Sequence, residues 1–225
     1  LALLTFSKIP LVLSFMGSDI YGTVDHKGNK KLKGLINYFL SMLIQPFVNQ
    51  IIVKSYNLSK YIYLKRKMKI IPNGVDFDVF KQINRNYCKD ILNLSQKKKY
   101  VLFLANKKNP RKNFPLLQSA LDLIDDPNIE LFDLEYPVSP VKVPLILNAS
   151  NVLVLTSFYE GSPNVIKEAM ACNIPIVSVD VGDVRAVCGG VEGCVISKND
   201  PLSIAEAIKS TIGTHQRTQG RKNIK

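Results

Sequence analysis

The chain has 225 residues, of which 46% are hydrophobic and 21% are charged. This balance is typical of globular proteins and excludes wholesale disorder, because it supplies enough apolar material for a core. The net charge is +12, from 30 basic and 18 acidic residues. Residues 1–99 hold 17 Lys and Arg against 5 Asp and Glu, whereas residues 100–225 hold 13 of each. The excess positive charge therefore lies in the first part, where it indicates either an anionic partner or a lysine-rich solvated face.

The cysteine and histidine content indicates no metal site. Four cysteines occur without a Cys-x-x-Cys pair: Cys88, Cys172, Cys188 and Cys194. Only His26 and His215 could add imidazole ligands, so the sequence predicts no zinc site. Free cysteines of this kind are typical of a reduced, cytoplasmic protein. The apolar run at 1–15 lacks the order of a signal peptide, and we interpret it as the interior of a truncated domain.

In the first part of the chain, short apolar runs alternate with turn signals. The predicted elements are a strand at 10–15, a turn at 17–19, a helix at 35–47, a strand at 50–53, a helix at 59–67 and a strand at 69–71. A turn signal, Pro72-Asn73-Gly74, follows the last of these strands. Residues 81–99 are polar and rich in Lys and Asn, so we place a domain boundary there.

The stretch 35–53 carries no charge, but its several Asn, Gln and Ser side chains are costly in hydrocarbon. A core helix followed by a buried strand is therefore favoured over a membrane-spanning helix. A basic cluster precedes the stretch: Lys27, Lys30, Lys31 and Lys33. Such a cluster beside an apolar helix also suits an anionic membrane surface, which we expect residues 27–67 to contact.

The second part alternates apolar strands with helices. The predicted elements are a strand at 100–105, a helix at 115–124, a strand at 152–155, a helix at 164–172, a strand at 176–179 and a helix at 201–210. This alternation predicts a parallel, doubly wound α/β sheet. The tail at 214–225 is polar, and we expect it to be loose.

The most informative segment is 156–175, where a strand ends, a loop turns and a helix begins with Pro163 in its first turn. The free amides and dipole of such a helix start form an anion site at the carboxyl edge of a parallel sheet. Glu160 lies in the loop and Glu168 lies eight residues on, within the helix. Two carboxylates placed in this way can accept hydrogen bonds from the hydroxyls of a sugar and a ribose. On spacing alone, however, the pair is more often a chance pattern.

Four segments carry a more specific resemblance. EGSPNVIKEAMACNIPIVSVDVGDV resembles the E-x7-E signature of family-four glycosyltransferases, and FLANKKNPRKNFPLL resembles the first strand and basic loop of the C-terminal domain in that family. IIPNGVDFDVF resembles the end of the last strand of its N-terminal domain, and PLVLSFMGSDIYG the strand and turn that bear its usual His-Gly pair. Together they cover nearly the whole chain in the order of the family.

The resemblance implies a GT-B architecture, in which two Rossmann-like domains with parallel sheets face each other across a cleft. It places a partial N-terminal, acceptor-side domain at 1–85, a linker at 86–99, a nucleotide-sugar-binding domain at 100–213 and a tail at 214–225. The first strand of the family should then precede Leu1, and its final helix should follow Lys225.

The resemblance also implies roles for individual residues. Glu160 contacts the donor sugar near the reacting carbon, and Glu168 binds the ribose. Lys107 stands where the family usually has Arg, and Lys112 matches the usual Lys. These two would neutralise the departing diphosphate, although Arg111 makes the assignment ambiguous by one position. The backbone of five further residues would line the donor: Gly161, Ser162, Pro163, Asn164 and Val165.

On the acceptor side, the resemblance points to four residues: Met16, Gly17, Ser18 and Asp19. Met16 replaces the usual His and cannot exchange a proton, so we expect weakened rather than abolished catalysis. The pair Asp76-x-Asp78 could hold a metal in the other glycosyltransferase fold, but here it follows Pro-Asn-Gly. We therefore interpret Asp76 as a turn residue.

The resulting hypothesis is a retaining, metal-independent hexosyltransferase without a cofactor. It would use a UDP- or GDP-sugar and a glycan or lipid-linked acceptor, in surface polysaccharide synthesis at the cytoplasmic face of the membrane. One alternative is a non-catalytic nucleotide-sugar binder, which the truncation favours. Another is a nucleotide-sugar epimerase, for which the two histidines offer little acid–base chemistry. No motif supports a nucleic-acid partner.

Overall fold

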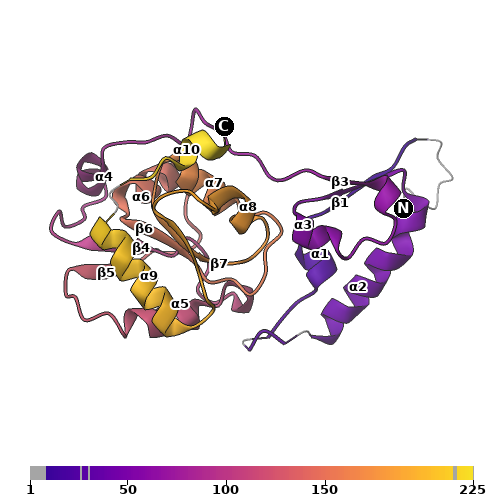
Figure 1. Cartoon of the computed structure of the whole chain (residues 1–225), viewed down its shortest axis with the longest axis horizontal. Coiled ribbons are helices and arrows are strands. Elements are labelled where there is room, and N and C mark those ends of the chain that lie inside the picture. Colours follow the sequence, from indigo (N-terminus) through magenta and orange to yellow (C-terminus); the bar gives the residue numbers. More distant parts are fainter. Residues whose placement is uncertain (1–8, 26, 30, 215–216, 225) are drawn as a thin grey trace.

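In a computed structural model, the chain forms two lobes, each built on a parallel β-sheet (Figure 1). The structure describes residues 9–25, 27–29, 31–214 and 217–224, so that His26, Lys30, His215 and the chain ends at 1–8 and 225 lie outside it. The first lobe has the strand order β1-β2-β3, and the second has β5-β4-β6-β7-β8. Neighbouring strands in the described part are parallel throughout. The predicted α/β class with parallel sheets is confirmed.

The first lobe is small and follows most of the predicted elements. In chain order it contains β1 (Val12–Phe15), α1 (Ser18–Tyr21), α2 (Leu32–Ile44), the 3-10 helix η1 (Gln45–Phe47), β2 (Gln50–Val53), α3 (Tyr56–Ser59), the 3-10 helix η2 (Lys65–Lys67) and β3 (Met68–Ile70). The expected helix at 59–67 is wrong. Ser55 caps α3 by accepting a hydrogen bond from the amide of Leu58, so the helix begins earlier, at Tyr56, and ends at Ser59.

The second lobe holds the larger core. Its elements are α4 (Arg85–Ile91), β4 (Lys99–Leu102), the 3-10 helix η3 (Pro110–Lys112), α5 (Phe114–Leu121), β5 (Ile129–Phe132), the 3-10 helix η4 (Pro140–Lys142), α6 (Val143–Ala149), β6 (Val152–Leu155), α7 (Asn164–Ala171), β7 (Ile176–Val179), α8 (Val184–Cys188), β8 (Cys194–Ser197) and α9 (Pro201–Thr214). Strands β6 and β7 occupy the predicted ranges, because all four residues of each are buried.

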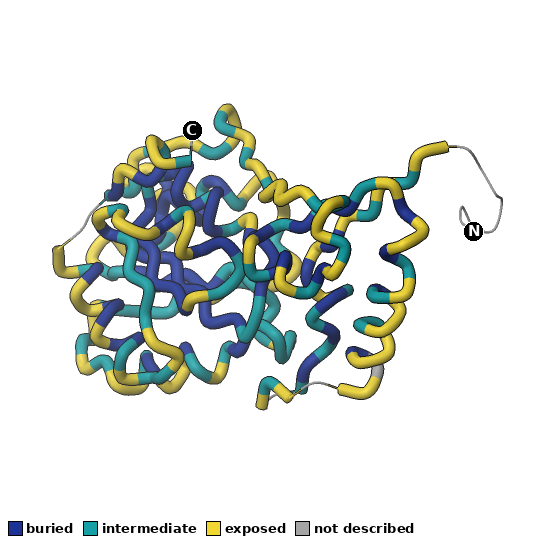
Figure 2. Tube along the Cα trace, turned by 45° about the vertical axis from the view of Figure 1, so that its right-hand side comes forward, coloured by how far each residue is buried: buried dark blue, intermediate teal, exposed yellow. Residues whose placement is uncertain are grey.

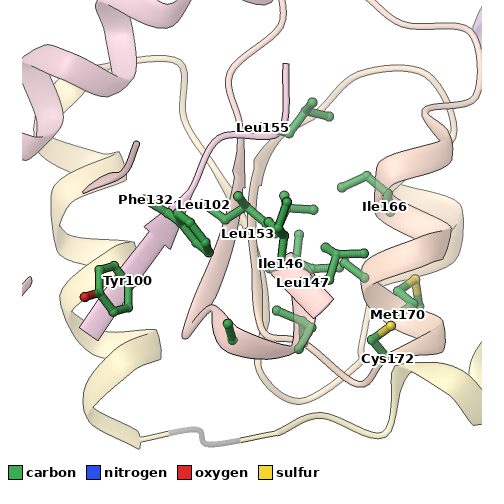
Figure 3. Close-up of a cluster of buried hydrophobic side chains, with 14 of the residues drawn as sticks. Tyr100, Leu102, Phe132, Ile146, Leu147, Leu153, Leu155, Ile166, Met170 and Cys172 are labelled. Atoms are coloured by element: carbon green, nitrogen blue, oxygen red, sulfur yellow. The ribbon is translucent and has the colours of Figure 1, made fainter. Parts of the chain in front are cut away.

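Apolar side chains cover both faces of this sheet. On one face, Leu102 and Leu153 of the central strands pack with Leu147 of α6 and with Ile166 and Met170 of α7 (Figure 3). On the other face, α5 and α9 cover the sheet. Buried residues accordingly gather in the second lobe, whereas much of α2 in the first lobe is exposed (Figure 2). The second lobe therefore gives the loops at its sheet edge a rigid base.

Two segments that were expected to lack structure are packed against the second lobe. Within the expected linker, α4 contacts α6 and buries Cys88. In the expected loose tail, α10 (Gly220–Ile224) packs against α7 and α8. Arg217 donates to the carbonyl of Ile83 (2.9 Å) and Arg221 donates to that of Phe80 (2.6 Å). The expectation of a loose tail is therefore wrong for 217–224, because hydrogen bonds from two guanidinium groups to backbone carbonyls hold this segment in place. The predicted domain boundaries stay a prediction.

Among the described residues, none of the helices combines the length and apolar character that crossing a bilayer requires.

Candidate active site

A crevice forms where the strand order of the second sheet reverses. Strand β5 lies on one side of β4 and β6 on the other, so the loops that follow β4 and β6 diverge at the carboxyl edge. A cavity of about 590 Å³ occupies this position. Its walls come from both loops, from the start of α7, and from Met16, Gly17, Ser18 and Asn73 of the first lobe.

A buried carboxylate bound by two cations lies in this cavity. Arg111 Nη1 and Lys112 Nζ each lie 2.6 Å from a different oxygen of Glu160, and Ser157 Oγ donates to Glu160 Oε1 (2.8 Å). Burial alone would raise the pKa of Glu160, but the charges of Lys112 and Arg111 outweigh it and lower the pKa. Glu160 is therefore ionised at neutral pH, and the cluster keeps one excess positive charge beside the cavity.

The two cations reach Glu160 because of the local shape of the β4 loop. The Asn109 side chain accepts a hydrogen bond from the amide of Arg111 (3.1 Å) and so caps the short helix η3. This turn presents Arg111 and Lys112 together. Lys107 does not line the cavity, because its ammonium pairs with Asp133 (2.5 Å). Of the three basic residues that the sequence singled out, the structure thus brings Arg111 and Lys112 to the site.

Glu168 lines the same cavity from the second turn of α7. In the part of the chain that the structure describes, its carboxylate has no hydrogen bond or ion pair, and burial raises its pKa. Helix α7 begins at Asn164, directly after Pro163, and both residues line the cavity, so the start of the helix lies at the cavity wall. The five backbone residues expected to line a donor all border this cavity: Gly161, Ser162, Pro163, Asn164 and Val165.

The two lobes meet at Gly161. A Cβ atom built there would lie 2.1 Å from the carbonyl oxygen of Met16, so only glycine permits this approach. On the first lobe, the amides of Met16 and Gly17 donate to the Asp19 carboxylate (2.9 and 2.7 Å). Met16, Gly17 and Ser18 therefore line the cavity, whereas Asp19 fixes their backbone without lining it.

Comparison with known proteins relates part of the chain to one enzyme family. Residues 136–213 match the family model for glycosyl transferases group 1. D-inositol 3-phosphate glycosyltransferase from Geodermatophilus obscurus is 26% identical over 186 residues, which cover 67% of this chain and 41% of that protein.

Two solved structures share the fold of this chain. Sucrose-phosphate synthase from Thermosynechococcus elongatus has a TM-score of 0.77 at 19% identity over 99% of this chain and 65% of its own. HepE of Anabaena, in complex with UDP-glucose, has a TM-score of 0.72 at 19% identity over 96% of this chain and 66% of its own. The likeness shows a fold of the GT-B type. The chain spans less than half the length of the curated relative and about two thirds of the two structures.

Several residues of this cavity and its surroundings were not singled out from the sequence. The cavity also has apolar and aromatic lining residues: Phe80, Leu104, Tyr136, Val138 and Val143. A buried ion pair, Lys167–Asp183 (2.6 Å), lies behind Ser162. For this pair a sequence signal existed, since Lys167 lies between the apolar residues Ile166 and Met170 of the helix, but its partner lies 16 residues away and only the fold brings the two together.

Asp76 has the hydrogen bonds of a turn residue. Its carboxylate accepts hydrogen bonds from the amides of Asp78 (2.9 Å) and Val79 (3.2 Å), as expected of a turn residue. Within the described residues, His, Cys, Asp and Glu side chains do not gather in groups of three or more that could hold a metal ion.

Proposed function

We propose that the chain carries the donor site and part of the acceptor side of a retaining hexosyltransferase. It would transfer a hexosyl group from a UDP- or GDP-sugar to a glycan or lipid-linked acceptor without a bound metal. The observation that supports this most strongly is the Glu160–Arg111–Lys112 cluster, which lies beside the start of α7 at the point where the strand order reverses. This edge of an open parallel sheet is where ligands of such folds bind.

The cavity has the features that a nucleoside diphosphate sugar requires. Its volume of about 590 Å³ lies in the usual range for small-molecule sites. Its lining includes two cations and the start of α7, which suit a diphosphate, and apolar side chains that can cover a base. Glu168, which lacks a partner among the described residues, can accept hydrogen bonds from ribose hydroxyls. The match to HepE, whose structure contains UDP-glucose, also favours this class of donor.

The cluster also suggests how the reaction proceeds. Glu160 is ionised, so it can accept a hydrogen bond from a sugar hydroxyl and face the positive charge that develops at the reacting carbon. Arg111 and Lys112 would neutralise the departing diphosphate. In a front-face route, the acceptor attacks from the side of the departing diphosphate, so the configuration at the sugar is retained. An oxygen of the departing phosphate takes the acceptor proton. Such a route needs no base at position 16, where this chain has methionine.

The positive charge and the exposed apolar residues of the first part of the chain favour a phosphorylated or membrane-linked acceptor. The excess positive charge of the whole chain lies in residues 1–99, and α2 exposes Phe39 (64%) and Leu43 (67%). Residues 27–67 would therefore contact anionic lipid at the inner face of the plasma membrane. The matched relative from Geodermatophilus obscurus acts, by its name, on D-inositol 3-phosphate. Co-sedimentation with vesicles should increase with their anionic lipid content, and equal sedimentation with neutral vesicles would contradict this part of the proposal.

A second candidate function is nucleotide-sugar binding without catalysis, which Met16 favours. Met16 is 54% exposed and lines the cavity. At this position, the family-four glycosyltransferases that the sequence resembles usually carry histidine. The two functions separate in one assay, because a binder retains UDP-glucose without hydrolysing or transferring it. We expect Met16→His to raise the turnover of the 225-residue chain. An unchanged turnover would contradict the prediction that methionine at this position weakens catalysis.

The donor class can be tested by a thermal-shift screen with UDP, GDP and their hexose conjugates. A ligand that binds only the folded protein raises Tm, by an amount that grows with its concentration relative to Kd. We expect one of the two nucleotide series to raise Tm. A screen in which neither series shifts Tm at millimolar concentration would contradict the proposal.

A further inference from the structure

A fully bonded hydroxyl lies at the edge of the cavity. Ser162 Oγ donates to Asp183 Oδ2 (2.7 Å) and accepts from Lys167 Nζ (2.7 Å) and from the amide of Asn73 (3.0 Å). A serine hydroxyl offers one donor and two acceptor sites, so all of its capacity is used. Ser162 thereby joins the loop before α7, the turn before α8 and the segment after β3 of the first lobe.

The ion pair behind Ser162 is deeply buried. Lys167 Nζ lies 2.6 Å from both oxygens of Asp183, and the two side chains are 4% and 6% exposed. A buried pair of this kind is a weak source of stability, because removing both charges from water costs nearly as much as their attraction returns. Asp183 also occupies the N-cap of α8 without capping it, since its carboxylate turns toward Lys167 instead. A positional role explains both features.

One side chain of the first lobe, that of Asn73, also contacts the loop that carries Ser162 and the start of α7. Asn73 Nδ2 donates to the carbonyl of Ser162 (2.9 Å) and to Asn164 Oδ1 (2.8 Å). These bonds reach the last part of the loop and the first residue of α7, both of which line the cavity. Asn73 follows β3 and therefore belongs to the first lobe.

We propose that Asn73, Lys167 and Asp183 are positioning residues that act through Ser162: they hold the start of α7 in the orientation that receives the donor diphosphate, and they make this orientation depend on contact between the lobes. We call these four residues the Ser162 latch. The inference rests on the proposed function, because it assigns the donor diphosphate to the start of α7. It implies that the donor site is complete only when the two lobes touch.

The test compares two asparagines that bridge the lobes. Asn73→Ala and the isosteric Asn73→Asp remove the side-chain donations to Ser162 and Asn164. The control, Asn57→Ala, removes an interlobe bond of similar length to the carbonyl of Gly182 (3.0 Å) without touching Ser162. UDP and GDP are titrated into the 225-residue chain and each variant by calorimetry. Hydrogen exchange of residues 160–166 is measured without nucleotide, and Tm is recorded to confirm folding.

We expect both Asn73 variants to bind the nucleotide about tenfold more weakly at nearly unchanged Tm, with faster exchange at 160–166, and Asn57→Ala to bind like the wild type. Ser162→Ala, which keeps the Lys167–Asp183 pair, should weaken binding in the same way. Equal affinity in the Asn73 and Asn57 variants would overturn the latch while leaving the donor site intact. If the unmodified chain binds neither UDP nor GDP, the proposed donor site is wrong and the latch falls with it.

Discussion

At the scale of single residues, the two glutamates of the cavity differ in their surroundings. Glu160 is paired with Arg111 and Lys112, which lower its pKa despite burial, whereas burial raises the pKa of Glu168, which has no ion pair within the described residues. The first carboxylate is thus charged and paired. The second is buried without a charged partner among the described residues, which costs stability when it is ionised.

Replacing Glu160 should separate binding from turnover. Glu160→Gln keeps the shape but frees Arg111 and Lys112, so UDP should bind as tightly as before or more tightly. Transfer from the sugar nucleotide should fall by about 10²–10³-fold, because the carboxylate that we propose faces the reacting carbon is lost. Calorimetry and a turnover assay measure the two effects. Glu130→Gln, which removes a carboxylate paired with Lys98 on the outer strand β5, is the control. Parallel losses of UDP affinity and turnover would contradict the assigned role.

Replacing Glu168 should stabilise the fold and weaken donor binding. The folded-state pKa of Glu168 lies above its ordinary value of 4.5, so the folded state holds the proton more tightly than the unfolded chain does. Stability is therefore lost as the pH rises from 4.5 through the raised pKa. We expect Glu168→Gln to raise Tm at pH 7 by about 1–3 °C, with the difference vanishing below pH 4.5. A lower Tm at pH 7 would show that the carboxylate is stabilised by a partner instead.

At the scale of elements, strands were easier to predict than the turns that build the site. Strands β2, β6 and β7 match their predicted ranges, because short apolar runs with buried β-branched residues leave few alternatives. Strands β5 and β8 were missed, since their residues are mostly half-buried and neither strand has four apolar residues in a row. The pairing of Arg111 and Lys112 with Glu160 depends on the turn at η3, which periodicity does not report.

The loop at Gly161 should tolerate no side chain. Gly161→Ala places a Cβ about where the carbonyl oxygen of Met16 lies, so either the loop shifts or the lobes separate. A displacement of about 1 Å at a catalytic site costs roughly 10²-fold in rate, and we expect a turnover loss of about that size. Gly74→Ala is the matched control, because its Cβ would meet no atom within 4 Å. Equal turnover in the two variants would contradict the close contact between the lobes.

Helix α10 should contribute measurably to stability. Arg221 donates to the carbonyls of Phe77, Phe80 and Ala171 and stacks over the ring of Phe77 at 4.8 Å. Arg221→Ala leaves these carbonyls without their partner, which should lower the free energy of unfolding by about 1–3 kcal/mol. Lys222→Ala, at an exposed neighbouring position, should change it by less than about 0.5 kcal/mol. Denaturant titration of both variants measures these changes in the free energy of unfolding. Equal unfolding midpoints in the two variants would contradict a stabilising role for α10.

At the scale of the whole molecule, the sequence predicted the fold class and most of the cavity wall, but not how the lobes meet. The E-x7-E segment is local, so its loop, helix start and two glutamates could be located from 20 residues of sequence. The contacts of Asn73 with Ser162 join positions 89 residues apart, and Arg221 reaches Phe77 over 144. Such contacts follow from the placement of two sheets, which no local pattern encodes.

The two lobes also divide the charge of the chain. Among the described residues, the basic first part lines the cavity through Met16, Gly17, Ser18, Asn73 and Phe80, none of which is charged, so the cations at the cavity come from the second lobe. The positive charge of residues 1–99 can therefore attract an anion other than the donor. This division favours an anionic acceptor or membrane surface over a second contact with the nucleotide.

The central claim is that Arg111 and Lys112 receive a nucleoside diphosphate at the carboxyl edge of the second sheet. The most direct test is calorimetric titration of UDP and GDP into the chain and into Lys112→Met, with Lys98→Met, whose ammonium pairs with Glu130 on the outer strand, as the control. We expect one nucleotide to bind the chain and the control alike, and to bind Lys112→Met at least about tenfold more weakly. Unchanged affinity in Lys112→Met, or no binding of either nucleotide to the chain, would contradict the claim.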